Sequence, residues 1–314
     1  MPQSTSQKTL KKAVTLEGIG LHSGKKARVK IHPGRPGSGI VFVRGDLSDS
    51  PAIPALASSV VSTQLATTLG IGNVTIATVE HLLAALQGLG VDNAWVEVDG
   101  PEMPILDGSS APFCRAISEA GLVAQVKART TLVLRRRVEV KLNEKWAVAE
   151  PCSRLEVQGT IDWDHPVVGF QEYHYVEGRT PFAELASART FCFLRDVEAM
   201  KKKGLALGGS LENAIVVDEA SVLNPEGLRG PDEFVRHKVL DALGDFKLLG
   251  YPLQAYVRLH RAGHDLHFQL MQAILKDSAN YELVTSTSEA EAAQPTLGFA
   301  QASVMAGRRF ASGY

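Results

Sequence analysis

The chain has 314 residues, of which 45% are hydrophobic and 21% are charged, a balance typical of a globular protein with about two domains. Its net charge of -1 argues against binding nucleic acid through a large basic surface, because such binding needs clustered Lys and Arg. No stretch approaches the ~20 apolar residues of a membrane span, and the N-terminus lacks the apolar run of a signal peptide, so we expect a cytoplasmic monomer without a transmembrane segment.

The first part of the chain predicts alternating strands and helices. ARVKIHP and GIVFVRG are strand-like and are separated by the turn-rich PGRPGSG. TVEHLLAALQGLG predicts a helix that glycine ends before the strand NAWVEVDG. SAPFCRAISEAGL predicts a second helix, with Ser110 as its N-cap and Pro112 in its first turn.

After VAQVKART the pattern begins again. TLVLRRRVEVKL, WAVAEP and RLEVQGTIDW predict strands, FVRHKVLDALGDFKLLG a helix, LQAYVRLHRAGH a strand and loop, and HFQLMQAILK a last helix. The repeated order predicts two α/β units. We place them at residues 1–126 and 127–284, followed by a loosely ordered, Ala- and Ser-rich tail at 285–314.

The three cysteines, Cys114, Cys152 and Cys192, are odd in number and have no CxxC spacing. This pattern favours neither a disulfide framework nor a cysteine zinc site, and we expect reduced, mostly buried thiols.

The segment EFVRHKVLDALGDF, residues 233–246, carries polar side chains in an otherwise apolar helical pattern. His237 and Asp241 lie one turn apart, about 6 Å along the axis, so both can reach one metal ion. Asp245 lies about 12 Å from His237, too far to bind the same ion, and better suits a group that orients a neighbouring acid or base. A partly buried histidine held by an aspartate is the alternative interpretation of the pair.

Glu80 and His81 are candidates for the general base and the third metal ligand, which the pair of His237 and Asp241 does not provide. A hydrolytic zinc site needs about three protein ligands, an open position and a nearby general base. His81 would be the third ligand, Glu80 the base, and His264 a candidate acid. His267 either faces this site or simply follows His264 by one helical turn. Two other histidines, His32 and His174, are most simply surface or packing residues.

Six motifs, in this order, resemble the UDP-3-O-acyl-N-acetylglucosamine deacetylases, which perform the committed step of lipid A (lipopolysaccharide) synthesis in Gram-negative bacteria: TVEHLLAALQGLGVDN, PILDGSSAPF, ARTFCFLRD, GLALGGSLENAIV, DEFVRHKVLDALGD and GHDLH. The resemblance covers residues 8 to about 280. It implies an α+β fold of two similar domains, each a layered α/β sandwich with a small inserted element, and an active site between them.

The resemblance also implies a role for each site residue. Its metal ligands match His81, His237 and Asp241. Its catalytic residues match Glu80 as base, His264 as electrostatic partner or acid, Asp245 as the carboxylate that orients His264, and Thr190 and Lys238 as side chains that line the site and hold the reacting group. Zinc is the implied ion, and iron(II) competes with it for two histidines and an aspartate.

The resemblance places the substrate contacts mostly in the second half. The insertion at about 193–217 implies a hydrophobic passage for the acyl chain, which Val197, Met200, Leu205 and Leu207 would line. Phe191 matches a residue that touches substrate near the zinc. The segment IDWDHP matches the uracil site through Asp162 and Trp163, and Arg261 stands where a basic residue meets the diphosphate.

We therefore predict a zinc-dependent hydrolase that removes the N-acetyl group of an acylated UDP-N-acetylglucosamine and releases acetate. Two alternatives stay open at this point. One is another zinc amidase of the same fold that acts on a substrate without an acyl chain. The other is a non-catalytic protein that binds zinc or a sugar nucleotide, although no fourth protein ligand for a closed structural site is evident.

Overall fold

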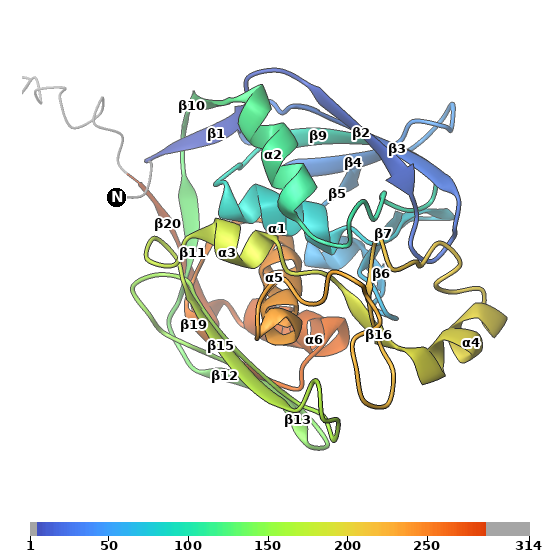
Figure 1. The fold of residues 1–314 in the computed structure, drawn as a ribbon. Coiled ribbons are helices and arrows are strands. Elements are labelled where there is room, and N and C mark those ends of the chain that lie inside the picture. The colour runs from blue at the N-terminus through green and yellow to red at the C-terminus, as the bar shows by residue number, and fades with distance from the viewer. Residues whose placement is uncertain (1–4, 287–314) are drawn as a thin grey trace, which may run out of the picture.

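The computed structural model describes residues 5–286 and contains two five-stranded sheets on opposite sides of a helical centre (Figure 1). The first sheet has the order β2 (Val14–Ile19), β3 (Lys26–Pro33), β9 (Ala94–Asp99), β4 (Ile40–Arg44) and β5 (Ile53–Pro54). The second has the order β12 (Val138–Leu142), β13 (Lys145–Glu150), β19 (Tyr256–His260), β14 (Glu156–Asp162) and β15 (Phe170–Val176).

The two sheets repeat one topology. In each sheet the central strand, β9 or β19, is the last of the five along the chain. It pairs antiparallel with β3 or β13 on one side and parallel with β4 or β14 on the other. Ala94 lies opposite Ile40 in the first parallel pair, and Tyr256 lies opposite Glu156 in the second. The predicted α+β fold with two similar halves is therefore confirmed, whereas the boundary between the domains stays a prediction.

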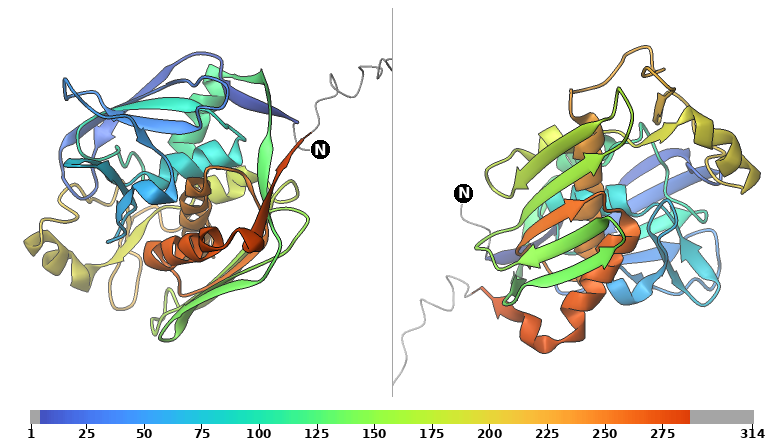
Figure 2. Two further views of the ribbon diagram at one scale, coloured as in Figure 1. Left: turned by 180° about the vertical axis from the view of Figure 1, so that it is seen from behind. Right: turned by 90° about the horizontal axis from the view of Figure 1, so that it is seen from below.

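The described residues form six α-helices, and those outside a projecting element lie in the space between the sheets. The six are α1 (Glu80–Gly88), α2 (Ala111–Ala120), α3 (Phe182–Ala186), α4 (Leu194–Lys202), α5 (Glu233–Phe246) and α6 (His264–Lys276). In Figure 1, α1 and α2 lie beside the first sheet. On the second sheet, α5 packs on β14 and β15 and α6 packs on β12 and β13, and the view from below shows this sheet with its helices (Figure 2). Because α1 packs on α5, the halves meet through the two helices that carry the predicted metal ligands.

Smaller elements join and extend the halves. The remaining strands are β1 (Ser6–Leu10) paired with β10 (Leu122–Ala128); β6 (Val60–Ser62), β7 (Thr68–Ile71) and β8 (Val74–Ile76); β11 (Thr130–Leu134) between β18 (Leu253–Gln254) and β20 (Tyr281–Thr285); and β16 (Phe191–Phe193) beside β17 (Ile215–Val217). Short 3-10 helices form at Ala57–Ser59, Lys247–Leu249 and Ser278–Asn280. The element formed by β16, α4 and β17 projects from one side (Figure 1).

Several local predictions differ from the structure. The stretch TLVLRRRVEVKL is two strands, since the backbone amides of Arg135 and Arg136 turn to the Asn280 carbonyl and end β11. Ser110 occupies the N-cap position of α2 but caps nothing, because its hydroxyl donates to the His81 carbonyl at 2.7 Å. The last helix begins at His264, three residues earlier than predicted.

Two predictions from bulk properties can be compared with the described residues. The three cysteines are free, as expected, but they are half-buried rather than mostly buried. Among residues 5–286, no helix is long and apolar enough to cross a membrane. The predicted tail falls outside the described residues from position 287 onward.

Gly244 sets the distance between α5 and α1. A Cβ at this position would collide with the Glu80 carbonyl oxygen and lie 2.9 Å from the Glu80 carbonyl carbon and 3.1 Å from the Ala84 nitrogen. These are backbone atoms of a buried helix, so a rotamer change cannot relieve the overlap. The absence of a side chain at residue 244 thus lets Glu80 approach the helix that carries the predicted ligands.

Gly244→Ala should therefore destabilise the protein. In an unobstructed helix the change would stabilise by about 1 kcal/mol through helix propensity. Overpacking of a dense core costs about 1–3 kcal/mol, and we expect that effect to win. Urea unfolding measures the difference, and an increase in the free energy of unfolding would contradict the packing argument.

Candidate active site and metal centre

Three helices bring their polar residues to one point between the halves. Glu80 and His81 open α1, His237, Asp241 and Asp245 follow one another along α5, and His264 is the first residue of α6. The chain enters α1 through Thr78, whose φ of 60° lies in the left-handed region that non-glycine residues rarely adopt. Strain of this kind is concentrated at functional sites.

His81, His237 and Asp241 converge on a small volume. Their ligand atoms lie within 4.8 Å of one another, and all three residues are buried. Asp241 Oδ1 is 3.3 Å from His237 Nε2 and 3.6 Å from His81 Nε2. The structure thus brings together the three residues that the sequence proposed as metal ligands.

The donor set fits a divalent metal ion. His237 Nδ1 must carry its proton, because it lies 3.0 Å from the Ala188 carbonyl, which can only accept. Burial lowers the pKa of His237 to about 3, so the ring is neutral and Nε2 presents a lone pair. Asp241 Oδ1 has no hydrogen-bond partner among the described residues. Unsatisfied lone pairs facing each other in a buried site are costly without a cation.

The Asp241 carboxylate is held in its charged form. Burial by itself would raise its pKa, but the Lys238 ammonium and the neighbouring His81 hold the pKa well below its usual range. Lys238 Nζ donates to Oδ2 at 3.0 Å, which leaves Oδ1 for an ion. Carboxylate oxygen and imidazole nitrogen suit both zinc and iron(II), so the ligands alone do not choose between them.

Glu80 lies beside these ligands without joining them. Its Oε2 accepts the backbone N–H of Thr67 at 3.1 Å, and its Oε1 lies 3.9 Å from His264 Nε2. Burial raises the pKa of Glu80, whereas His264 and His81 oppose the shift. A carboxylate whose pKa is moved toward neutrality is better suited to accept a proton.

Asp245 serves His264 rather than the metal group. Its Oδ2 accepts His264 Nδ1 at 2.7 Å and His267 Nδ1 at 2.8 Å, and its Oδ1 accepts the Thr67 hydroxyl at 2.6 Å. Because both imidazole nitrogens donate to one oxygen, this second cluster is a hydrogen-bonded group and not a metal site. Burial would lower the pKa of His264, but Asp245 and then Glu80 raise it to about 9, so His264 is a cation at neutral pH.

Thr190, Phe191 and Lys238 border the same site. A cavity of about 30 Å³ is lined by Glu80, His81, Thr190, His237, Lys238, Asp241 and His264, together with Leu21, His22, Leu65 and Thr78. The Lys238 ammonium lies 5.4 Å from the centre of the Phe191 ring. The cavity thus contains seven of the predicted ligand and catalytic residues, with Asp245 behind them.

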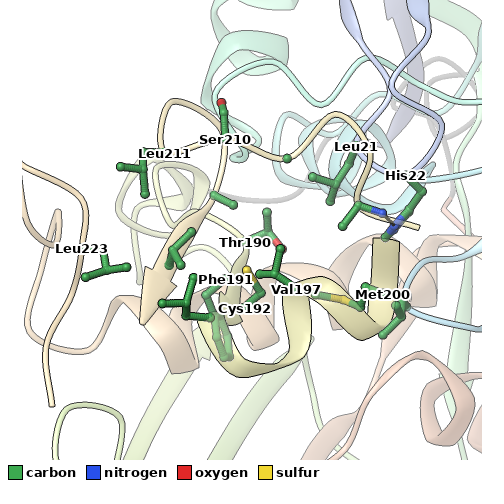
Figure 3. Close-up of a pocket in the computed structure, with 16 residues that line it drawn as sticks. Leu21, His22, Thr190, Phe191, Cys192, Val197, Met200, Ser210, Leu211 and Leu223 are labelled. Atoms are coloured by element: carbon green, nitrogen blue, oxygen red, sulfur yellow. Dashed lines mark hydrogen bonds between the residues drawn. The ribbon is translucent and has the colours of Figure 1, made fainter. Parts of the chain in front are cut away.

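A larger apolar cavity adjoins the first. It has a volume of about 370 Å³ and is lined mainly by side chains of β16, α4, β17 and the loops around them (Figure 3). Leu21, His22, Leu65 and Thr190 line both cavities, so the apolar space begins at the catalytic residues. Val197 and Met200 line it, as predicted from the insertion.

Leu205 and Leu207 do not line this cavity, in contrast to the prediction. Ala206 lies between them, has a φ of 54° and lines the cavity itself. The left-handed turn at Ala206 points this one residue inward, and Leu207 is 51% exposed.

The predicted nucleotide contacts gather at one edge of the second sheet. Asp162 ends β14, and Arg261 follows the parallel neighbour β19, with its backbone N–H donating to the Thr160 carbonyl at 2.8 Å. Asp162 and Arg261 are exposed. Trp163 is half-buried, and its ring packs edge-on against Phe191 at 5.6 Å, which already gives it a structural role.

The sequence prediction missed three residues that support the site. Thr67 links Glu80 to Asp245 through its N–H and hydroxyl, and nothing in its local sequence distinguishes it. His22 lies where the two cavities meet, and burial lowers its pKa. The buried Arg189 donates to Glu233 at 2.9 Å and so fixes the segment whose Ala188 carbonyl holds His237.

Comparisons with known proteins agree on one family. Residues 7–276 match the family model described as UDP-3-O-acyl N-acetylglycosamine deacetylase. A UDP-3-O-acyl-N-acetylglucosamine deacetylase of Myxococcus xanthus is 51% identical over 284 residues, 90% of each chain. Proteins of the same name from Anaeromyxobacter dehalogenans and Geobacter sp. (strain M21) are 48% and 46% identical, over 92% and 95% of this chain and 94% and 98% of their own.

Proposed function

The chain belongs to the family of UDP-3-O-acyl-N-acetylglucosamine deacetylases, and from this premise we propose that it hydrolyses the N-acetyl group of an acylated UDP-N-acetylglucosamine. The reaction releases acetate and leaves the free amine on the sugar. It is the committed step of lipid A biosynthesis. The observation that carries the proposal is the apolar cavity that starts at the predicted catalytic residues, because it offers an acyl chain a place beside a site for amide hydrolysis.

His81, His237 and Asp241 would hold the catalytic ion. We propose zinc, with iron(II) as the competing ion, because two imidazoles and one carboxylate leave room for an open position. When bound, such an ion supplies Lewis acidity that polarises the amide carbonyl and makes water a better nucleophile. Lys238 keeps one oxygen of Asp241 occupied and lies between the ion site and the ring of Phe191.

The protein's own groups would move the protons. Glu80 takes the proton of the attacking water. The backbone N–H of Thr67 holds the Glu80 carboxylate in place. The cationic His264 and the hydroxyl of Thr190, which lines both cavities, stabilise the oxyanion that develops on the carbonyl. As the C–N bond breaks, Glu80 or His264 delivers a proton to the leaving amine. Asp245 holds His264 in the orientation that this step needs.

The nucleotide would lie at the edge formed by Asp162, Trp163 and Arg261. The exposed carboxylate could accept an N–H of the base, and the exposed guanidinium suits a diphosphate by its forked donors. Trp163 bridges this edge to the cavity through its contact with Phe191. Leu205 and Leu207 are left out of the acyl site, and Ala206 takes their place.

Acetate release from substrates of graded acyl length tests this function. Burial gains about 0.8 kcal/mol per methylene, so kcat/KM should rise up to about fourfold per added carbon until the cavity is filled. A chelator should abolish the release at every length. A flat dependence on chain length would favour the alternative amidase that acts on a substrate without an acyl chain. No release from any of them would favour a binding protein.

A single substitution can assign the acyl chain to the cavity. Ala214 is buried and lines it, so Ala214→Phe should lower kcat/KM at least tenfold for the longest chain and leave the shortest almost unchanged. Ala124→Phe, on an exposed position of β10, is the matched control. An unchanged length profile in Ala214→Phe would place the acyl chain elsewhere.

A further inference from the structure

A second large cavity lies away from the catalytic site, where the two halves meet along β1, β10 and β11. It has a volume of about 370 Å³, and its lining includes Gly37, Asp92, Lys127, Arg129, Lys247 and Tyr251. It shares no lining residue with the apolar cavity or the catalytic cavity. This volume is within the range of about 300–1,000 Å³ that is usual for small-molecule sites.

The cavity is strongly cationic. Lys127, Arg129 and Lys247 face one carboxylate, Asp92, so three positive charges meet one negative charge. Both oxygens of Asp92 are already occupied, one by Arg129 Nε at 2.8 Å and the other by the backbone N–H of Lys8 at 2.8 Å. Asp92 therefore has little capacity left to neutralise the two lysines.

Lys247 is the most deeply buried of these cations. It is 7% exposed, and its Nζ donates to the Val91 carbonyl at 2.9 Å, the single hydrogen bond found for it among residues 5–286. Burial lowers its pKa to about 8, although the charges of Asp92 and Glu177 partly oppose this shift. Lys247 thus stays mostly charged at neutral pH. A neutral carbonyl does not offset the cost of burying an ammonium group, whereas a bound anion would.

Lys127 completes the site from the exposed side. Its Nζ lies against the backbone of Gly37, where a Cβ would overlap it, and the φ of 79° at Gly37 also requires glycine. The Gly37 N–H donates to Gln7 at 2.8 Å, which fixes the loop beside the lysine. The exposed Lys127 thus lies at the outer side of the cavity, and the buried Lys247 lies at its inner side.

We propose that this cavity binds a small oxyanion, a phosphate- or carboxylate-bearing molecule, between Lys127, Arg129 and Lys247. Arginine and lysine together are the usual partners of such groups, by forked hydrogen bonds and by point charge. Because the lining comes from both halves, a bound anion stabilises their contact. Lys247 directly follows α5 and reaches the segment after α1, so the anion lies at the far ends of the two helices that carry the metal ligands.

Calorimetric titration of the full-length holoenzyme with inorganic phosphate and with citrate, at low ionic strength, tests the proposal. Glycerol serves as the uncharged probe. We expect Lys247→Met to weaken anion binding about tenfold or more, since it removes a buried charged donor. Lys127→Gln should weaken binding about two- to fivefold, as expected for an exposed charge. Lys145→Gln, on an exposed lysine of β13 outside the cavity, is the matched control.

Lys247→Arg preserves the charge and should retain binding if the buried position tolerates the larger group. Should Lys247 variants fail to fold, Lys127→Gln against Lys145→Gln decides the question alone.

Tighter binding of phosphate than of citrate identifies a phosphorylated ligand, and the reverse order identifies a carboxylate. Equal affinity of wild type and Lys127→Gln, or no binding to wild type at millimolar anion, overturns the proposal. If the anion bound at the catalytic metal instead, these variants would not change its affinity. That case would therefore also give equal affinities for wild type and Lys127→Gln.

Discussion

Glu80→Gln lowers the rate of deacetylation by about 100- to 10,000-fold, the usual contribution of a general base, while the protein keeps its metal. Glutamine has the size of glutamate and can still accept the Thr67 N–H through its amide oxygen, so the local structure is preserved. It cannot take a proton from water. Single-turnover acetate release and the metal content of the same sample provide the two measurements.

The control for this substitution is Glu97→Gln, on a partly exposed position of β9 remote from the catalytic cavity. It should leave the rate unchanged. A pure Glu80→Gln protein that turns over like the wild type would exclude Glu80 as the base. A protein that has lost its metal would instead make Glu80 part of the metal site.

His81→Ala should lose the metal together with the activity. It removes one of three ligands, so the loss of affinity should exceed the roughly 10- to 100-fold typical of removing a supporting residue around a metal. Elemental analysis after anaerobic purification measures the content and also distinguishes zinc from iron. Because a bound ligand stabilises the folded state, a chelator should lower the melting temperature of the wild type and leave that of His81→Ala unchanged.

His174→Ala is the matched control, since this histidine is exposed and paired with Glu156. It should retain full metal content and the response to chelator. If His81→Ala also retained both, the ion would have to be held by other residues. The buried cluster of Asp245, His264 and His267 would then be the next group to examine, despite its hydrogen bonds.

The predictions that depended on residues close together in the sequence agree best with the structure. The helix predicted at 234–250 is present as α5 at Glu233–Phe246, followed by a 3-10 turn at Lys247–Leu249, and its apolar positions, such as Val239 and Leu243, are buried. Asp245 was excluded from the metal ligands by its distance along the helix, and it contacts His264 instead. The prediction failed for the turn around Ala206, where a left-handed residue changes which side chain faces the cavity.

The sequence by itself determined the helices α1, α2, α5 and α6, the repeat of two halves and the one-turn spacing of His237 and Asp241, because covalent geometry and the period of a helix fix such relations within a few residues. Only the tertiary structure brought His81 to this pair, since that approach depends on how closely α1 packs on α5 at Gly244. It also decided that Thr67 joins Glu80 to Asp245 and that Lys247 lies buried beside a cationic cavity. Contacts between distant segments follow from the packing of whole elements, which no local pattern encodes.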